Sequence, residues 1–175
     1  MNILGISGSL RTASANTTLL KAAAALAPRH IRLLVYSGIG DLPHFNPDLD
    51  VDPAPLTVAK FRSHLCQAAG VIISTPEYAH GVPGVLKNAL DWLVASGELY
   101  NKPVALFCTS GRGTYAQASL TETLSVMMAR VVPEASITIP LLGKKLDESG
   151  IMAEPEISNA ICGAVARFAE AISRE

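Results

Sequence analysis

The segment that most constrains the fold is residues 71–93, which read VIISTPEYAHGVPGVLKNALDWL. It begins with an apolar, β-branched run that is typical of a strand buried on both faces. Pro76 has no backbone N–H to donate to a sheet, so we expect the strand to end before it. Pro83 is favoured in the first turn of a helix, and apolar residues then recur at helical spacing up to Leu93. The segment therefore predicts a strand, a polar loop on which a ligand could lie, and a helix.

The same alternation runs along the whole chain. Short apolar runs predict five strands, at residues 2–6, 31–36, 71–74, 104–107 and 135–139. Helical patterns predict five helices, at residues 17–26, 56–69, 83–93, 115–129 and 154–173. This alternation indicates an α/β fold in which a five-stranded parallel sheet carries helices on both faces. With 175 residues, no repeat and no linker, we expect residues 1–175 to form a single domain.

Three polar loops that contain glycine follow the first, third and fourth of these strands. They cover residues 7–16, 76–81 and 109–113. In parallel sheets of this kind, ligands bind beyond the carboxyl ends of the strands, where the winding reverses. If the strand order is 2-1-3-4-5, these three strands are neighbours. We therefore predict that the three loops converge on one pocket.

The first loop has the composition of an anion site. Gly8 lets the backbone approach a ligand closely, and the start of the following helix offers unpaired N–H groups to a phosphate. Either Ser14 or Asn16 is the expected N-cap. The side-chain donors around this turn are Ser9, Arg11, Ser14, Asn16 and Thr17. The alternative is that these residues only form a tight turn and cap the helix.

Residues 111–116, GRGTYA, match the G-x-G-x-x-A pattern of dinucleotide-binding folds. That pattern normally opens the first strand–helix unit of its domain, whereas here it follows the fourth expected strand. We interpret the segment as a loop that touches the edge of a ligand.

Composition argues against several classes of partner. The formal net charge is −1 with no basic run, so we expect no nucleic-acid binding. No apolar run approaches the roughly 20 residues that span a bilayer, and the N-terminus does not have the pattern of a signal peptide. Cys66, Cys108 and Cys162 form no disulfide or metal pattern, and we interpret them as reduced core residues. We therefore expect a cytoplasmic protein without a membrane partner or a metal site.

Several blocks of the sequence resemble the NADPH-dependent FMN reductase family. They are residues 8–11 with Asn16, 41–46, 76–78, 83–92 and 110–113, which together extend over nearly the whole chain. The resemblance implies a flavodoxin-like three-layer sandwich with FMN as cofactor and NADPH or NADH as electron donor. It also implies a small acceptor, which in this family is a flavin, a quinone, an azo compound or a chromate-like oxyanion.

The same resemblance assigns residues to the cofactor. The phosphate and ribityl positions match Ser9, Arg11, Ser14, Asn16 and Thr17. The loop along the isoalloxazine ring matches Pro76, Glu77, Tyr78, Ala79, His80 and Gly81, and the far edge of the ring matches Ser110 and Arg112. Because the flavin carries the chemistry, no catalytic side chain is expected. Tyr78 and His80 flank the ring site, where they could tune the ring or meet a substrate. The alternative is that they are ordinary loop residues, which we favour for His80.

The function implied is an NAD(P)H-dependent oxidoreductase with a ping-pong mechanism, in which nicotinamide and the acceptor use the same face of FMN in turn. One alternative is a flavodoxin-type electron carrier without nicotinamide activity. Such carriers are typically acidic and stack aromatic residues on the flavin, whereas this chain is near neutral and 5% aromatic. Another alternative is a flavin-free relative of the same fold.

The family resemblance also implies self-association. The helix after Pro83 is a usual dimer surface in the family, which predicts a homodimer or homotetramer. Trp92 lies on that helix, where it could serve the interface or the core, because tryptophan is common in both.

Overall fold

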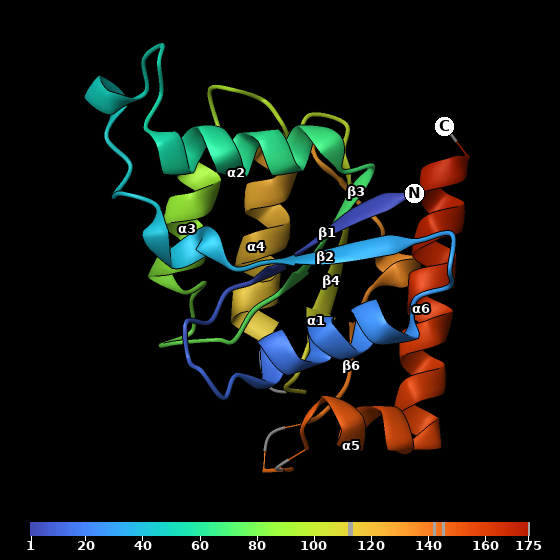
Figure 1. Cartoon of the computed structure of the whole chain (residues 1–175). Coiled ribbons are helices and arrows are strands. Elements are labelled where there is room, and N and C mark those ends of the chain that lie inside the picture. Colours follow the sequence, from blue (N-terminus) through green and yellow to red (C-terminus); the bar gives the residue numbers. More distant parts are fainter. Residues whose placement is uncertain (112–113, 142, 145, 175) are drawn as a thin grey trace.

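A parallel β-sheet forms the middle of three layers (Figure 1). The computed structural model describes residues 1–111, 114–141, 143–144 and 146–174. Its strands are β1 (Asn2–Ser7), β2 (Arg32–Tyr36), β3 (Gly70–Ser74), β4 (Pro103–Cys108), β5 (Arg130–Val131) and β6 (Ile137–Thr138). They are arranged in the order β2-β1-β3-β4-β5, and β6 pairs with the far end of β4. The predicted order of 2-1-3-4-5 is therefore confirmed.

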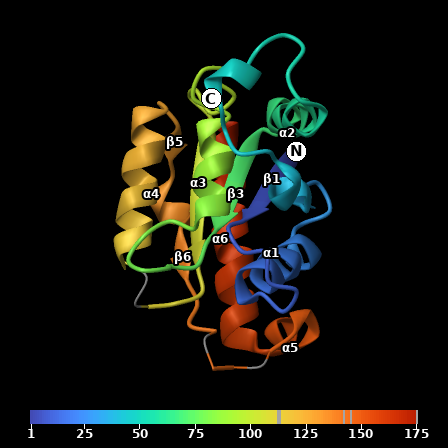
Figure 2. The same ribbon diagram turned by 90° about the vertical axis from the view of Figure 1, so that its left-hand side faces the viewer.

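Helices cover both faces of this sheet (Figures 1 and 2). They are α1 (Ala15–Leu26), α2 (Leu56–Gln67), α3 (Gly84–Asp91), α4 (Thr114–Val126), α5 (Glu148–Ala153) and α6 (Pro155–Ser173). Ile72 packs with α1, α5 and α6, whereas its neighbours Val71 and Ile73 pack with α2, α3 and α4. Because side chains alternate along a strand, a continuous apolar run is buried on both faces. No helix in the described part of the chain is long and apolar enough to cross a bilayer.

The fifth predicted strand, residues 135–139, is reduced in the structure to β6, and the short strand β5 before it was not predicted. A short 3₁₀ helix, Pro133–Ala135, separates β5 from β6. Pro133 has no N–H to donate, so it interrupts the ladder. Across the gap, Ser136 Oγ accepts a hydrogen bond from Leu106 N at 3.0 Å in place of a strand carbonyl. The six-residue helix α5 was not predicted either, because it is too short to show a helical period.

Trp92, which follows α3, belongs to the core. Its side chain is fully buried, and its indole ring meets Phe45 edge-on at 5.1 Å between ring centroids. The indole Nε1 donates to the carbonyl oxygen of Pro43 at 2.8 Å. Of the two alternatives from the sequence, the structure supports a core role for this residue.

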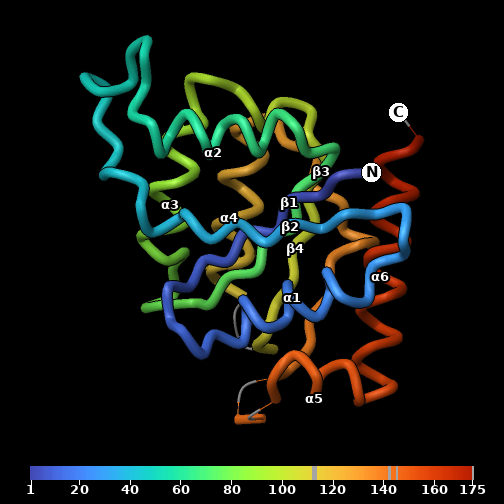
Figure 3. The backbone as a smooth tube through the Cα atoms, viewed as in Figure 1, coloured from blue at the N-terminus to red at the C-terminus, as the bar shows by residue number. Residues whose placement is uncertain are grey.

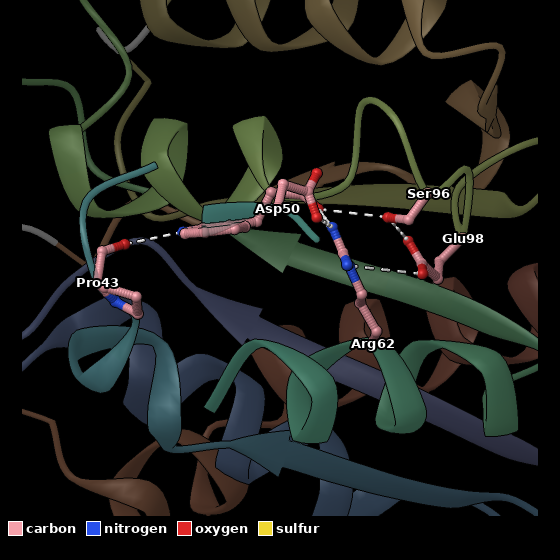
Figure 4. A network of polar contacts seen from close by, with 6 residues as sticks. Pro43, Asp50, Arg62, Ser96 and Glu98 are labelled. Carbon is pink, nitrogen blue, oxygen red and sulfur yellow. Dashed lines mark hydrogen bonds and ion pairs between the residues drawn. The ribbon is translucent and has the colours of Figure 1, made fainter. Parts of the chain in front are cut away.

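Arg62 of α2 ties two long loops to this core (Figure 4). Its guanidinium donates to the carbonyl oxygen of Trp92 and lies 2.8 Å from Asp50 Oδ1 and 3.8 Å from Glu98 Oε1. Ser96 Oγ donates to the other oxygen of Glu98 at 2.6 Å. These side chains are mostly buried, so the single guanidinium offsets the charge of two carboxylates that water reaches only in part.

The interpretation of all three cysteines as core residues is wrong for two of them. Cys108 is buried and Cys162 is half-buried, but Cys66 is exposed, and all three are free thiols. The apolar stripe of α2 faces the sheet, and Cys66 lies beside this stripe on the solvent side. Burial raises the pKa of the Cys108 thiol, which keeps it in the uncharged form.

Candidate functional site

The loops after β1, β3 and β4 meet at the lower edge of the sheet in the view of Figure 1. A cavity of about 340 Å³ lies between them, within the range of roughly 300–1,000 Å³ that is typical of small-molecule sites. The residues that line it are Ser9, Arg11, Ser14, Ala15, Asn16, Pro76, Glu77, Tyr78, Thr109 and Ser110. The structure thus brings predicted site residues from all three loops to one cavity.

The first loop presents the start of α1 to this cavity. Ser14 is the N-cap, and its Oγ accepts a hydrogen bond from Thr17 N at 3.3 Å. The first N–H groups of a helix have no partner within the helix, and Ala15 and Asn16 carry two of them at the cavity wall. Residues 7–16 contain Arg11 and no Asp or Glu. The loop therefore caps its helix and also offers donors and positive charge to an anion.

The first loop lies beside the second (Figure 3), and the contact between them is at Gly8. Its backbone N–H donates to the carbonyl oxygen of Ser74, at the end of β3, at 2.8 Å. A Cβ atom on Gly8 would lie 2.3 Å from Thr75 Oγ1 and 2.9 Å from Thr75 Cβ. The two loops can therefore touch only because this position has no side chain.

The second loop ends in a tight hairpin turn. Tyr78 and Gly81 exchange backbone hydrogen bonds of 3.1 and 2.9 Å. The two residues between them, Ala79 and His80, have φ angles of 49° and 59°, a left-handed conformation that Asn and Gly usually adopt in such turns. Tyr78 lines the cavity, whereas Ala79, His80 and Gly81 form the tip of the turn outside the lining.

Glu77 joins the second loop to the start of α4. Its Oε2 accepts a hydrogen bond from Ala116 N, in the first turn of α4, at 2.8 Å. Its Oε1 lies 3.3 Å from His80 Nδ1, and the His80 ring meets Tyr115 at 4.4 Å between centroids. A carboxylate at a helix N-terminus is favoured by the hydrogen bond and by the helix dipole. The sequence predicted Glu77 for the site but not this contact, because Ala116 is distant in the chain.

Two further predicted residues differ in their placement. The Thr17 hydroxyl donates to Ser7 Oγ at 2.8 Å, and Thr17 does not line the cavity. Arg112 lies outside the described residues. Thr109 lines the cavity although it was not predicted as a site residue, and its place directly after β4 was the available signal.

Comparisons with a family model and with known proteins all identify the same family of reductases. The model of the NADPH-dependent FMN reductase family matches residues 1–141. A quinone reductase of Escherichia coli (strain K12) is 30% identical over 182 residues, which cover 99% of this chain and 96% of that protein. An NAD(P)H-dependent FMN reductase of Pseudomonas aeruginosa is 33% identical over 155 residues, which cover 86% and 83% of the two chains.

Solved structures agree with this result. FerB, a flavoenzyme NAD(P)H:(acceptor) oxidoreductase from Paracoccus denitrificans, superposes with a TM-score of 0.87 at 28% identity and covers 99% of this chain and 97% of its own. A flavodoxin, WrbA-like protein from Agrobacterium tumefaciens gives a TM-score of 0.67 at 14% identity, with coverage of 99% and 98%. The second likeness shows the fold alone, and the two together confirm the predicted flavodoxin-like architecture.

Proposed function

The chain belongs to the NADPH-dependent FMN reductase family, and we propose that it passes electrons from NAD(P)H, through FMN held in the three-loop cavity, to a small acceptor. It is an oxidoreductase with FMN as cofactor and NAD(P)H as donor. The proposal concerns where the cofactor binds, the order of the reaction and the nature of the acceptor.

The convergence of the three loops on one cavity carries this proposal. FMN combines a phosphate dianion, a polar chain and a flat ring. The cavity wall offers hydrogen-bond donors at the first loop, and the second and third loops lie opposite them. The donors of the first loop suit the phosphate and ribityl chain, and we assign Ser9, Arg11, Ser14, Asn16 and Thr17 to this part. Thr17 would act by holding Ser7 and Ser14 in place, because its hydroxyl donates to Ser7 Oγ and its backbone N–H donates to Ser14 Oγ.

The second and third loops suit the ring. We assign Pro76, Glu77, Tyr78, Ala79, His80 and Gly81 to one side of it, and Ser110 and Arg112 to its far edge. The turn at residues 78–81 would contact the ring largely through its backbone. The Glu77 carboxylate is not available to the ring, because it accepts a hydrogen bond from α4. The side chain of His80 is 73% exposed, which supports its contact with a substrate while the backbone of His80 borders the ring.

Bound FMN would supply the hydride and electron chemistry, and the nicotinamide and the acceptor would use it in turn, which is ping-pong order. The chain itself binds and orients the participants. The donors of the first loop fix the phosphate end, and the hairpin of the second loop sets the position of the ring. Tyr78 is 53% exposed beside the cavity, where its ring can pack on a flat donor or acceptor.

The names of the relatives support a quinone or a free flavin as the acceptor, with azo compounds and chromate-like oxyanions as further candidates of the same class. We also propose a homodimer or homotetramer, supported by the exposed apolar side chains of Leu10, Tyr78 and Val94. A cytoplasmic location is supported by the three free thiols.

Anaerobic reduction tests the proposed function. FMN-loaded protein is mixed with NADPH or NADH while the flavin absorbance is followed, and quinones, flavins, azo dyes and chromate are then added in turn. We expect rapid bleaching by the nicotinamide, recovery with at least one acceptor, and parallel double-reciprocal plots in the steady state. Protein that binds FMN but turns over NAD(P)H no faster than free FMN would instead behave as an electron carrier.

A further inference from the structure

Asn16 lies where three segments of the fold meet. It is the second residue of α1 and is 4% exposed. Its Oδ1 accepts hydrogen bonds from Ser74 Oγ at 3.0 Å and from Thr109 Oγ1 at 3.2 Å. Ser74 is the last residue of β3 and Thr109 follows β4, so one amide oxygen connects the first loop to the ends of two strands.

The two hydroxyls determine which way the Asn16 amide faces. Both are buried, with Ser74 fully enclosed and Thr109 3% exposed. Within the described part of the chain, neither hydroxyl has another acceptor for its proton. If the amide were reversed, two buried hydroxyl protons would lose their partner, at a cost of about 1–3 kcal/mol each. The oxygen of the amide therefore faces Ser74 and Thr109.

The nitrogen of the same amide is left available. No acceptor in the described part of the chain receives a hydrogen bond from Asn16 Nδ2. Asn16 nonetheless lines the cavity, beside Ser14 and Ala15 at the start of α1. An almost buried NH₂ group with two donors at this position matches the oxygens of a phosphate or a ribityl chain.

We propose that Ser74 and Thr109 are positioning residues, which hold the Asn16 amide with its NH₂ group toward the phosphate–ribityl part of FMN. The inference rests on the proposed function, because FMN is the ligand that this NH₂ group serves. Without the two hydroxyls, the amide rotates between two orientations, one of which presents an acceptor oxygen to the anion. Binding then loses a donor and gains a repulsive contact.

A pair of substitutions at Thr109 separates positioning from packing. Thr109→Val keeps the shape and removes the hydroxyl, whereas Thr109→Ser keeps the hydroxyl. The Kd of FMN is measured by quenching of its fluorescence, and Thr109→Val combined with Ser74→Ala is expected to raise it about tenfold. Thr109→Ser alone is expected to leave it within about twofold of the wild type. Ser136→Ala is the matched control, because this hydroxyl bonds to β4 at 3.0 Å but lies outside the cavity lining.

A double-mutant cycle with Asn16 completes the test. Asn16→Ala is expected to weaken FMN binding about tenfold in the wild type and by less than about threefold when both hydroxyls are absent. A structural role for the hydroxyls alone would leave the effect of Asn16→Ala the same in both backgrounds, and that result overturns the inference. Failure of the wild type itself to bind FMN would instead overturn the proposed function. Thermal denaturation of each apo variant checks that it is folded.

Discussion

At the scale of single residues, Arg11 is the cation that lines the cavity next to the start of α1. A charge-assisted bond from its guanidinium to phosphate is worth about 1.5–3 kcal/mol. Arg11→Ala is therefore expected to weaken FMN binding by about 10- to 150-fold, while riboflavin, which has no phosphate, binds as before. Isothermal titration measures both affinities.

Arg29→Ala is the control for this substitution, because Arg29 is also exposed but follows the opposite end of α1. Its affinity for FMN is expected to equal that of the wild type. If Arg11→Ala bound FMN as tightly as this control, Arg11 would not be the phosphate anchor.

Ala79 has a backbone conformation that suits another residue. Its φ of 49° is left-handed, which costs a residue with Cβ roughly 1–2 kcal/mol, whereas Asn tolerates it. Ala79→Asn is expected to stabilise the apo protein by up to about 1 kcal/mol, or roughly 2–4 °C in Tm. Ala118→Asn in α4 is the matched control at an exposed alanine, and helix propensity predicts a decrease there. A lower Tm for both variants would show that the turn does not strain Ala79.

At the scale of elements, the site depends on direct contact between the loops after β1 and β3. Gly8→Ala places a Cβ 2.3 Å from Thr75 Oγ1, so the loops must separate. We expect the free energy of unfolding to fall by about 1–3 kcal/mol and FMN binding to weaken as the cavity deforms. Gly84→Ala is the control, since a Cβ there meets nothing within 4 Å. Unchanged FMN affinity in Gly8→Ala would mean that the cavity tolerates separation of the two loops.

Glu77 is the corresponding link between the second loop and α4. Glu77→Ala removes the acceptor for Ala116 N and the charge at the helix N-terminus, and is expected to destabilise the protein by about 1–2 kcal/mol. Glu77→Gln keeps an acceptor oxygen, so its effect is expected to be about half as large. Urea denaturation measures both, with Glu122→Ala on the exposed side of α4 as the control. If Glu77→Ala and Glu122→Ala lowered the free energy of unfolding by the same amount, this link would have no stabilising role.

At the scale of the whole molecule, the features that follow from long patterns could be predicted from the sequence. Apolar runs such as residues 71–74 predicted the strands, and their order was that of the flavodoxin-like fold. The convergence of the loops follows from that order. The shortening of the fifth predicted strand to β6 was not predictable, because Ser136 bonds to Leu106 N through its side chain and not through its backbone. A side-chain hydrogen bond of this kind leaves no periodic signal in the sequence.

The same distinction applies to the site. Small polar residues at the ends of β1, β3 and β4 identified the loops that line the cavity. The contacts that hold them depend on partners far apart in sequence, as when Thr109 and Ser74 donate to Asn16. The left-handed turn at Ala79 also lacks the Asn or Gly from which such a turn is usually predicted. Tertiary contacts, which local patterns do not encode, determine these features.

The central claim is that the start of α1 holds the phosphate of FMN in the three-loop cavity. Titration of the apo protein with FMN and with riboflavin, at one ionic strength, tests it most directly. The account predicts that FMN binds at least about tenfold more tightly, because only FMN carries the anion that Arg11 and the helix N-terminus can bind. Equal affinity for the two flavins would contradict it.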